Sequence, residues 1–243
     1  MSKSTYQSYA KRHEQDDMSH VEQFYEKMRE RVCAVMAHVT HAVEKHNAGS
    51  LLDVGCSVGE FLLHAKRLHP SLHLTGLDLS EKLIEEARAN PRFEGIEFLC
   101  GDLMTMAFEK PFDIITLNNV FQFMNHDELP KAFMKCAEAL SSGGTLAACD
   151  LFHPFDQDLA IVEKNRWWRE ERTLYIRSQE TATETLRAAG FSEIEFVPFH
   201  MPHDIPRRDF SSDWSYTLGS ELGRLSMRGI ILYPYSILRA VKR

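Results

Sequence analysis

Apolar residues in the first fifth of the chain recur at the spacing of one helix face. Ser19 and Glu22 have the spacing of a capping box, in which a hydroxyl and a carboxylate satisfy free amides at a helix start. Apolar side chains then return every three or four residues over 21–43, and Gly49 marks a stop. The pattern predicts an amphipathic helix of about 25 residues. Its apolar stripe is a packing face, either for the chain's own sheet or for a second subunit.

After residue 50 the pattern changes to short apolar runs that alternate with helical segments. The predicted strands cover residues 51–54, 72–77, 96–100, 112–117, 145–149 and 191–197, and a last strand covers about 230–241. The predicted helices cover residues 60–68, 80–90, 127–140 and 178–189. Such alternation is typical of an α/β fold with a parallel sheet and helices on both faces. Ligands of these sheets bind outside the carboxyl ends of the strands.

Two long stretches interrupt this alternation, at residues 151–177 and 198–229. Long connections are often functional, and we expect both to cover the ligand-binding face. The predicted organisation is a single α/β domain with additions. It comprises a helical cap at 1–48, a core at 49–199, a lid at 200–229 and the last core strand at 230–243.

The composition and charge of the chain argue against several classes of protein. Of the 243 residues, 44% are hydrophobic and 26% are charged, which is typical of a globular protein. The formal charge of −7 argues against a nucleic-acid partner, because such binders rely on basic phosphate contacts. We see no apolar run long enough for a membrane span and no secretory signal, so we expect a cytoplasmic protein. The five cysteines form no CxxC pair, which argues against disulfides and a zinc site, and we expect no bound metal.

The segment at residues 53–60, Asp-Val-Gly-Cys-Ser-Val-Gly-Glu, joins the first predicted strand to the first core helix. Gly55 and Gly59 allow a sharp turn and a close ligand approach, and the amides at the helix start face the ligand. A dinucleotide-binding fingerprint would also need glycine at 57 and 60, where Ser57 and Glu60 stand. This spacing argues against a nicotinamide or flavin oxidoreductase.

The same segment resembles motif I of the class I S-adenosylmethionine-dependent methyltransferases of small-molecule type. The match lies at Asp53, Gly55 and Gly59, and Ser57 stands where the family usually has glycine. The resemblance implies a Rossmann-like, mostly parallel sheet of seven strands whose last strand is antiparallel. It also implies S-adenosylmethionine as cofactor and S-adenosylhomocysteine as product.

Residues after the next strands extend the resemblance. Asp78 ends the second strand, where a carboxylate can accept both ribose hydroxyls, and Asp102 follows the third, where the family binds adenine. The predicted cofactor-binding residues are Asp53, Gly55, Cys56, Ser57, Gly59, Asp78, Leu79, Asp102, Leu103, Asn118 and Asn119. The alternatives are that Asp78 and Asp102 cap helices, that Asn119 serves a turn and that Cys56 only packs.

The acceptor is less well marked. Methyl transfer is an in-line displacement, so the protein mainly positions the nucleophile, and a base is needed only where a proton must leave. His153, just past the fifth strand, is the first candidate for a base or orienting group, and His126 is the second. The alternative for His153 is a histidine hydrogen-bonded in a loop. Predicted substrate contacts are Tyr6, Tyr9, Phe121, Trp168, Arg207 and Trp214.

The predicted function is methylation of a small organic acceptor, with oxygen slightly favoured over nitrogen because of His153. Carbon, sulfur and carrier-bound acceptors stay open, as does the choice between monomer and homodimer. The alternative from another class is a catalytically inactive S-adenosylmethionine-binding module with a regulatory or scaffolding role.

Overall fold

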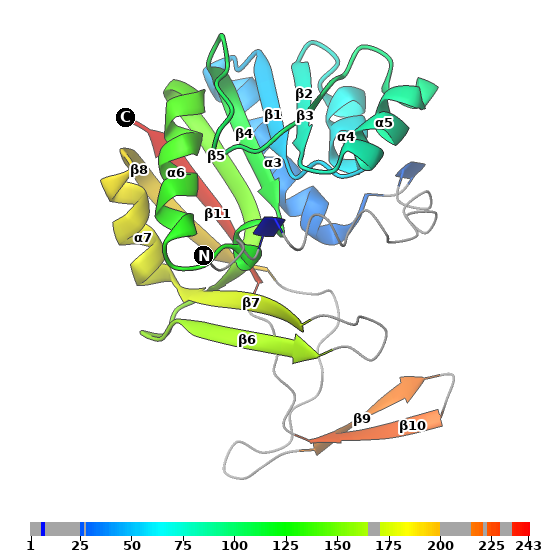
Figure 1. The fold of residues 1–243 in the computed structure, drawn as a ribbon, viewed down its shortest axis with the longest axis vertical. Helices are drawn as coiled ribbons and strands as arrows, with labels where there is room; N and C mark the ends of the chain where they lie inside the picture. The colour runs from blue at the N-terminus through cyan, green and yellow to red at the C-terminus, as the bar shows by residue number, and fades with distance from the viewer. Residues whose placement is uncertain are drawn as a thin grey trace.

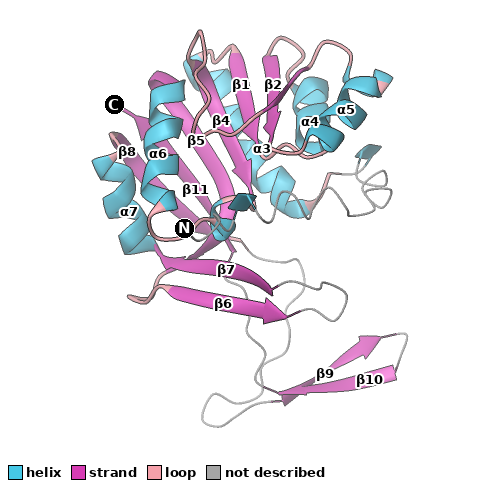
Figure 2. Cartoon of the chain, viewed as in Figure 1, coloured by secondary structure: helices cyan, strands magenta, loops and turns pink. Residues whose placement is uncertain are grey.

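A computed structural model describes residues 6–7, 25–26, 28–164, 171–199, 215–220, 223–228 and 235–243. A central sheet carries helices on both faces (Figures 1 and 2). This α/β architecture confirms the fold class expected from the alternating pattern. None of the helices in these ranges is both long enough and apolar enough to cross a membrane.

The main path of the sheet has the strand order β3-β2-β1-β4-β5-β11-β8. The bounds are β1 (Ser50–Val54), β2 (His73–Asp78), β3 (Glu97–Cys100), β4 (Phe112–Asn118), β5 (Leu140–His153), β8 (Phe191–Pro198) and β11 (Tyr235–Lys242). The pairs from β3 through β5 are parallel, whereas β11 runs antiparallel to both β5 and β8. The strand order reverses between β1 and β4, and such a reversal opens a crevice at the carboxyl ends of the strands.

Helices cover the sheet in two sets. They are α3 (Glu30–His46), α4 (Glu60–Leu68), α5 (Glu81–Ala89), α6 (Glu128–Ala139) and α7 (Gln179–Ala188), with short 3-10 turns η2 (Pro91–Phe93) and η3 (Phe121–Phe123). One apolar cluster joins α3, α4 and α5 to the sheet, and a second joins α6 and α7. Side-chain caps fix the first residues of α5 and α7. The hydroxyls of Ser80 and Ser178 accept hydrogen bonds from backbone amides in the first turns of these helices.

The predicted N-terminal helix is interrupted: residues 25 and 26 are helical, and helix α3 begins only at Glu30. Met28 and Arg29 are not helical, and Arg29 is extended with φ −70° and ψ 148°. This break lets the Arg29 side chain reach Glu60 on α4. The buried stripe of α3 packs on the chain's own sheet, which settles the open choice between sheet and second subunit for this helix. The capping box predicted at 19–22 lies outside the described residues.

The predicted helix at 127–140 agrees with α6 to within one residue at each end, but β5 begins at Leu140 and not at the predicted residue 145. Helix α6 ends at Ala139, and Leu140 is already extended and pairs with Phe112. Gly143 therefore lies within β5. At its other end β5 continues to His153, beyond the predicted end at residue 149.

The stretch 151–177, expected to cover the ligand-binding face, contains a hairpin. Strands β6 (Leu159–Lys164) and β7 (Glu171–Ser178) pair antiparallel, and the end of β7 pairs with the end of β5. Within the predicted lid, β9 (Ser215–Ser220) and β10 (Gly223–Arg228) form a second antiparallel pair. The remaining lid residues, and 230–234 of the predicted last strand, lie outside the described ranges. The division into cap, core and lid stays a prediction.

Candidate functional site

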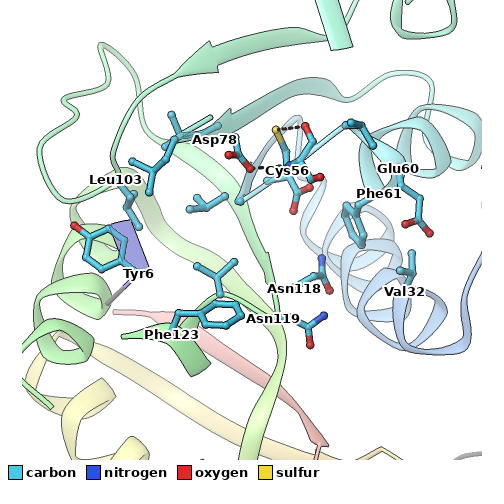
Figure 3. A pocket seen from close by; sticks show the side chains of 18 of the residues that line it. Tyr6, Val32, Cys56, Glu60, Phe61, Asp78, Leu103, Asn118, Asn119 and Phe123 are labelled. Carbon is cyan, nitrogen blue, oxygen red and sulfur yellow. Dashed lines mark hydrogen bonds between the residues drawn. The ribbon is translucent and has the colours of Figure 1, made fainter. Parts of the chain in front are cut away.

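A cavity of about 300 Å³ opens at the carboxyl ends of β1, β2, β3 and β4, where the strand order reverses (Figure 3). Ten of the eleven predicted cofactor-binding residues line it: Asp53, Gly55, Cys56, Ser57, Asp78, Leu79, Asp102, Leu103, Asn118 and Asn119. The eleventh, Gly59, precedes α4 as its N-cap. The strands therefore bring together residues that are up to 66 positions apart in the sequence.

The turn after β1 needs left-handed backbone. Gly55 has φ 72°, Ser57 has φ 51° and Gly59 has φ 82°. A Cβ atom on Gly55 would lie 2.6 Å from Cγ2 of Val120, so this position has no room for a side chain. Ser57 adopts the left-handed conformation that explains why the family usually has glycine there.

Asp78 ties this turn to β2. Its Oδ2 accepts the Ser57 amide at 2.8 Å, and its Oδ1 accepts the Ser80 amide at 2.9 Å. The helix α5 is capped by Ser80 and not by Asp78, whose carboxylate holds the Ser80 amide and also lines the cavity. These two backbone contacts are compatible with the predicted ribose contact, because each carboxylate oxygen can accept more than one hydrogen bond.

Asp102 anchors the neighbouring wall. Its Oδ1 accepts the Met104 amide at 2.9 Å, and its Oδ2 accepts the Tyr6 hydroxyl at 2.8 Å. Burial and the hydrogen bond to this carboxylate raise the pKa of the Tyr6 phenol. Tyr6, predicted as a substrate contact, therefore lies against the predicted adenine-binding residue and lines the same cavity.

The side chains of Asn118 and Asn119 bring polar atoms to the end of β4 (Figure 3). Both amide atoms of Asn118 and Oδ1 of Asn119 are buried, and within the described part of the chain they have no hydrogen-bond partner. A buried polar group without a partner costs about 1–3 kcal/mol. These atoms are therefore suited to bind polar groups of a ligand.

Asp53 lies beneath the turn and is 3% exposed. The Thr116 hydroxyl donates to its Oδ1 at 2.7 Å. Burial raises the pKa of Asp53 to about 7, and the nearby Asp78 and Glu60 carboxylates add to the rise. The hydrogen bond from Thr116 opposes this rise without cancelling it.

Two arginines at the start of α3 line the cavity and were missed by sequence reasoning. Arg29 forms a two-pronged ion pair with Glu60, with Nε donating to Oε1 at 3.0 Å. The Arg31 guanidinium has no hydrogen bond or ion pair with any residue that the structure describes. Both stood in the middle of a predicted continuous helix, where nothing in the pattern marked them as ligand contacts.

Several predicted acceptor-side residues lie elsewhere. His153 is 4% exposed, accepts the Phe155 amide on Nδ1 at 3.1 Å and is not among the residues that line the cavity. His126 is 61% exposed, 3.8 Å from Asp158 and also outside the lining. Phe121 is buried against Phe133 rather than facing the cavity. Tyr9, Trp168, Arg207 and Trp214 lie outside the described residues.

The position of His153 favours the alternative of a hydrogen-bonded histidine. Because β5 extends to residue 153, the ring belongs to a strand end and not to a free loop. With Nδ1 accepting a backbone amide, the neutral ring carries its proton on Nε2. A base role for His153 stays a prediction that its position does not support.

Comparison with known proteins finds similarity to methyltransferases. Residues 51–144 match the methyltransferase domain family. A malonyl-[acyl-carrier protein] O-methyltransferase of Bacillus cereus is 26% identical over 198 residues, which cover 73% of this chain and 72% of the relative. A demethylmenaquinone methyltransferase of Thermotoga maritima is 31% identical over 129 residues, which cover 53% of this chain and about half, 52%, of the relative.

Solved structures share the fold. An amino pentose methyltransferase from Micromonospora echinaspora with bound S-adenosylmethionine superposes with a TM-score of 0.61 at 18% identity, over 94% of this chain and 98% of its own. The N-methyltransferase NodS from Bradyrhizobium japonicum, in complex with S-adenosylhomocysteine, has a TM-score of 0.58 at 16% identity over 98% of both chains.

The chain has the Rossmann-like sheet of these solved methyltransferases. Residues 51–144 of this chain therefore carry a methyltransferase domain, and solved proteins of the same fold hold S-adenosylmethionine or S-adenosylhomocysteine.

Proposed function

We propose that this chain transfers the methyl group of S-adenosylmethionine to an oxygen atom of a small organic acceptor. One observation carries the proposal: a single cavity joins the left-handed turn at Gly55 to the carboxylates of Asp78 and Asp102 and to the buried asparagine amides. Support for oxygen comes from the similarity to the Bacillus O-methyltransferase.

The residues divide the cavity into parts suited to different ends of the cofactor. Asp78 would accept ribose hydroxyls, and Asp102 would accept the adenine amino group beside the Tyr6 hydroxyl. At the other end, Arg31 is a cation suited to the cofactor's carboxylate, and the amide of Asn118 can face its amino group.

S-adenosylmethionine supplies an electrophilic methyl group on a positively charged sulfur. The chain's own task is therefore to place the acceptor atom in line with that methyl and to exclude water. Val120, Phe123 and Met124 form an apolar wall next to Asn119, and we assign this wall to the acceptor side. The other side of the cavity, at Asp78 and Asp102, holds the carboxylates proposed for the nucleoside.

Calorimetric titration with S-adenosylmethionine and S-adenosylhomocysteine tests the cofactor site. We expect dissociation constants of about 10 μM or lower. A Gly55→Val variant is the negative control and should bind neither ligand. Its side chain would collide with Val120, and valine would have to adopt the positive φ of Gly55. Binding by neither protein, or equal binding by both, would contradict the assigned cavity.

Incubation with methyl-labelled cofactor and panels of carboxylic acids, phenols, amines and thiols tests the acceptor atom. We expect label in an ester or an ether, and alkaline release of labelled methanol identifies the ester. Label found only in amine or thiol products would overturn the assignment to oxygen while leaving the cofactor site intact.

A further inference from the structure

Arg177, near the end of β7, is a charged side chain inside the molecule, with an exposed fraction of 2%. Its guanidinium donates from Nη1 to the Phe121 carbonyl oxygen at 3.2 Å and from Nη2 to the Met124 carbonyl oxygen. These two carbonyls belong to the first residue of η3 and to the residue that follows it. One arginine therefore holds both ends of this turn.

Asp150 on β5 holds the same turn from the other strand. It is 1% exposed, and its Oδ2 accepts the Phe121 amide at 2.7 Å while its Oδ1 accepts the Leu151 amide at 2.8 Å. The Phe121 amide thus donates to the Asp150 carboxylate, and the Phe121 carbonyl oxygen accepts from the Arg177 guanidinium. Burying two opposite charges is costly unless hydrogen bonds satisfy them. Here backbone carbonyls accept from both Nη atoms of Arg177 and backbone amides donate to both oxygens of Asp150. The Arg177 Nε is buried and has no hydrogen-bond partner among the described residues.

The opposite side of this turn faces the cavity. Val120, Phe123 and Met124 line it. The Phe123 ring also packs in a small apolar cluster with Leu174 and Ile176 of β7. The β6–β7 hairpin is therefore joined to the cavity wall by both polar and apolar contacts, although it pairs with β5 through only two residue pairs. Figure 1 shows the hairpin beside the lower end of β5.

We propose that Arg177 is a positioning residue through which the β6–β7 hairpin fixes the turn at residues 121–124, and that this hairpin thereby sets which acceptors fit. The proposal rests on the assignment of the Val120, Phe123 and Met124 wall to the acceptor side. The carboxylates proposed for the nucleoside are carried by β2 and the segment after β3, so a change at Arg177 should separate acceptor recognition from cofactor binding.

Variants Arg177→Gln and Arg177→Lys test the role, with Arg239→Gln as the matched control. Arg239 lies on β11 and also binds a carboxylate and a backbone carbonyl, both of Glu193. The readouts are the dissociation constant of S-adenosylhomocysteine, the ¹³C-methyl resonance of Met124 and the KM of the acceptor found in the screen. Met36, buried on α3, provides the reference methyl.

For Arg177→Gln we expect S-adenosylhomocysteine affinity within threefold of the parent and an acceptor KM raised at least tenfold, with a smaller change in kcat. The Met124 resonance should shift or broaden while Met36 stays in place. Arg177→Lys should recover part of both effects, because it keeps a cationic donor. Arg239→Gln should change none of them.

An unchanged Met124 resonance in Arg177→Gln, or a KM equal to that of Arg239→Gln, would overturn the proposal. Cofactor affinity that falls in parallel with acceptor affinity would also overturn it, because the arginine would then support the whole site. Should Arg177→Gln not fold, Asp150→Asn replaces it, since the amide oxygen can still accept the Phe121 amide, and a smaller Met124 shift is expected. The Met124 spectrum needs no ligand, so it decides the role of Arg177 even if the cofactor fails to bind.

Discussion

An Asp78→Ala variant is expected to bind S-adenosylmethionine about 100-fold more weakly than the parent. The carboxylate accepts the Ser57 amide at 2.8 Å and, in the proposed complex, ribose hydroxyls as well. A hydrogen bond to a charged group contributes about 1.5–3 kcal/mol, and about 2.7 kcal/mol corresponds to a 100-fold change in affinity. The substitution removes the ligand contact and loosens the turn together, so calorimetry should show a large loss.

Asp113→Ala is the matched control for this effect. Asp113 also accepts backbone amides, from Gly49 and Ser50 at 2.8 and 3.1 Å, but it lies at the opposite ends of β1 and β4. This variant should lower the melting temperature while leaving cofactor affinity within threefold. Similar losses of affinity in both variants would show that a loosened sheet, rather than a lost ribose contact, explains the Asp78 result.

An Asp53→Asn variant is expected to be more stable than the parent at pH 8, by a few kcal/mol, and close to it at pH 4. The pKa of Asp53 is raised from 3.8 to about 7 in the folded chain. The folded state therefore binds more protons than the unfolded state between these values, so the parent loses stability as pH rises from about 4 to about 7. A shift of about three pKa units sets an upper limit near 4 kcal/mol.

Chemical denaturation at several pH values measures this effect. In Asp53→Asn the side-chain amide oxygen can still accept the Thr116 hydroxyl, so the variant keeps the main contact and removes the charge. Asp113→Asn should behave in the opposite way, because hydrogen bonds lower the pKa of that carboxyl and stabilise the protein at higher pH. A pH profile of Asp53→Asn parallel to the parent's would refute the assignment of this titration to Asp53.

The core of the sheet is predictable from sequence because each strand there repeats the same signals. Short buried runs such as β1 and β2 end in or are followed by glycine, serine or acidic residues that start a helix or line the cavity. The strand-end rule therefore locates Asp78, Asp102 and Asn118 in one cavity without any structure. Their roles in binding remain proposals.

The acceptor side was not predictable in the same way. Arginine is almost never fully buried, so nothing in the pattern suggested that Arg177 lies beneath η3, more than 50 residues away in sequence. The β6–β7 hairpin was not predicted; its buried Leu174 and Ile176 pack against Phe123 and Leu151, contacts that the sequence alone does not reveal. The expected base, His153, was chosen by its place after a strand, but the strand continues through it.

Two of the five cysteines are exposed and can be labelled selectively with reporter groups, whereas the other three are buried. Cys56, Cys136 and Cys149 are buried, and burial raises the pKa of each thiol, which keeps it in the unreactive protonated form. Cys33 on α3 and Cys100 at the end of β3 are exposed. Cys100 adjoins Gly101 in the cavity wall, whereas α3 packs on the sheet. Dyes attached to this pair would report the distance between cap and cavity without any engineered cysteine.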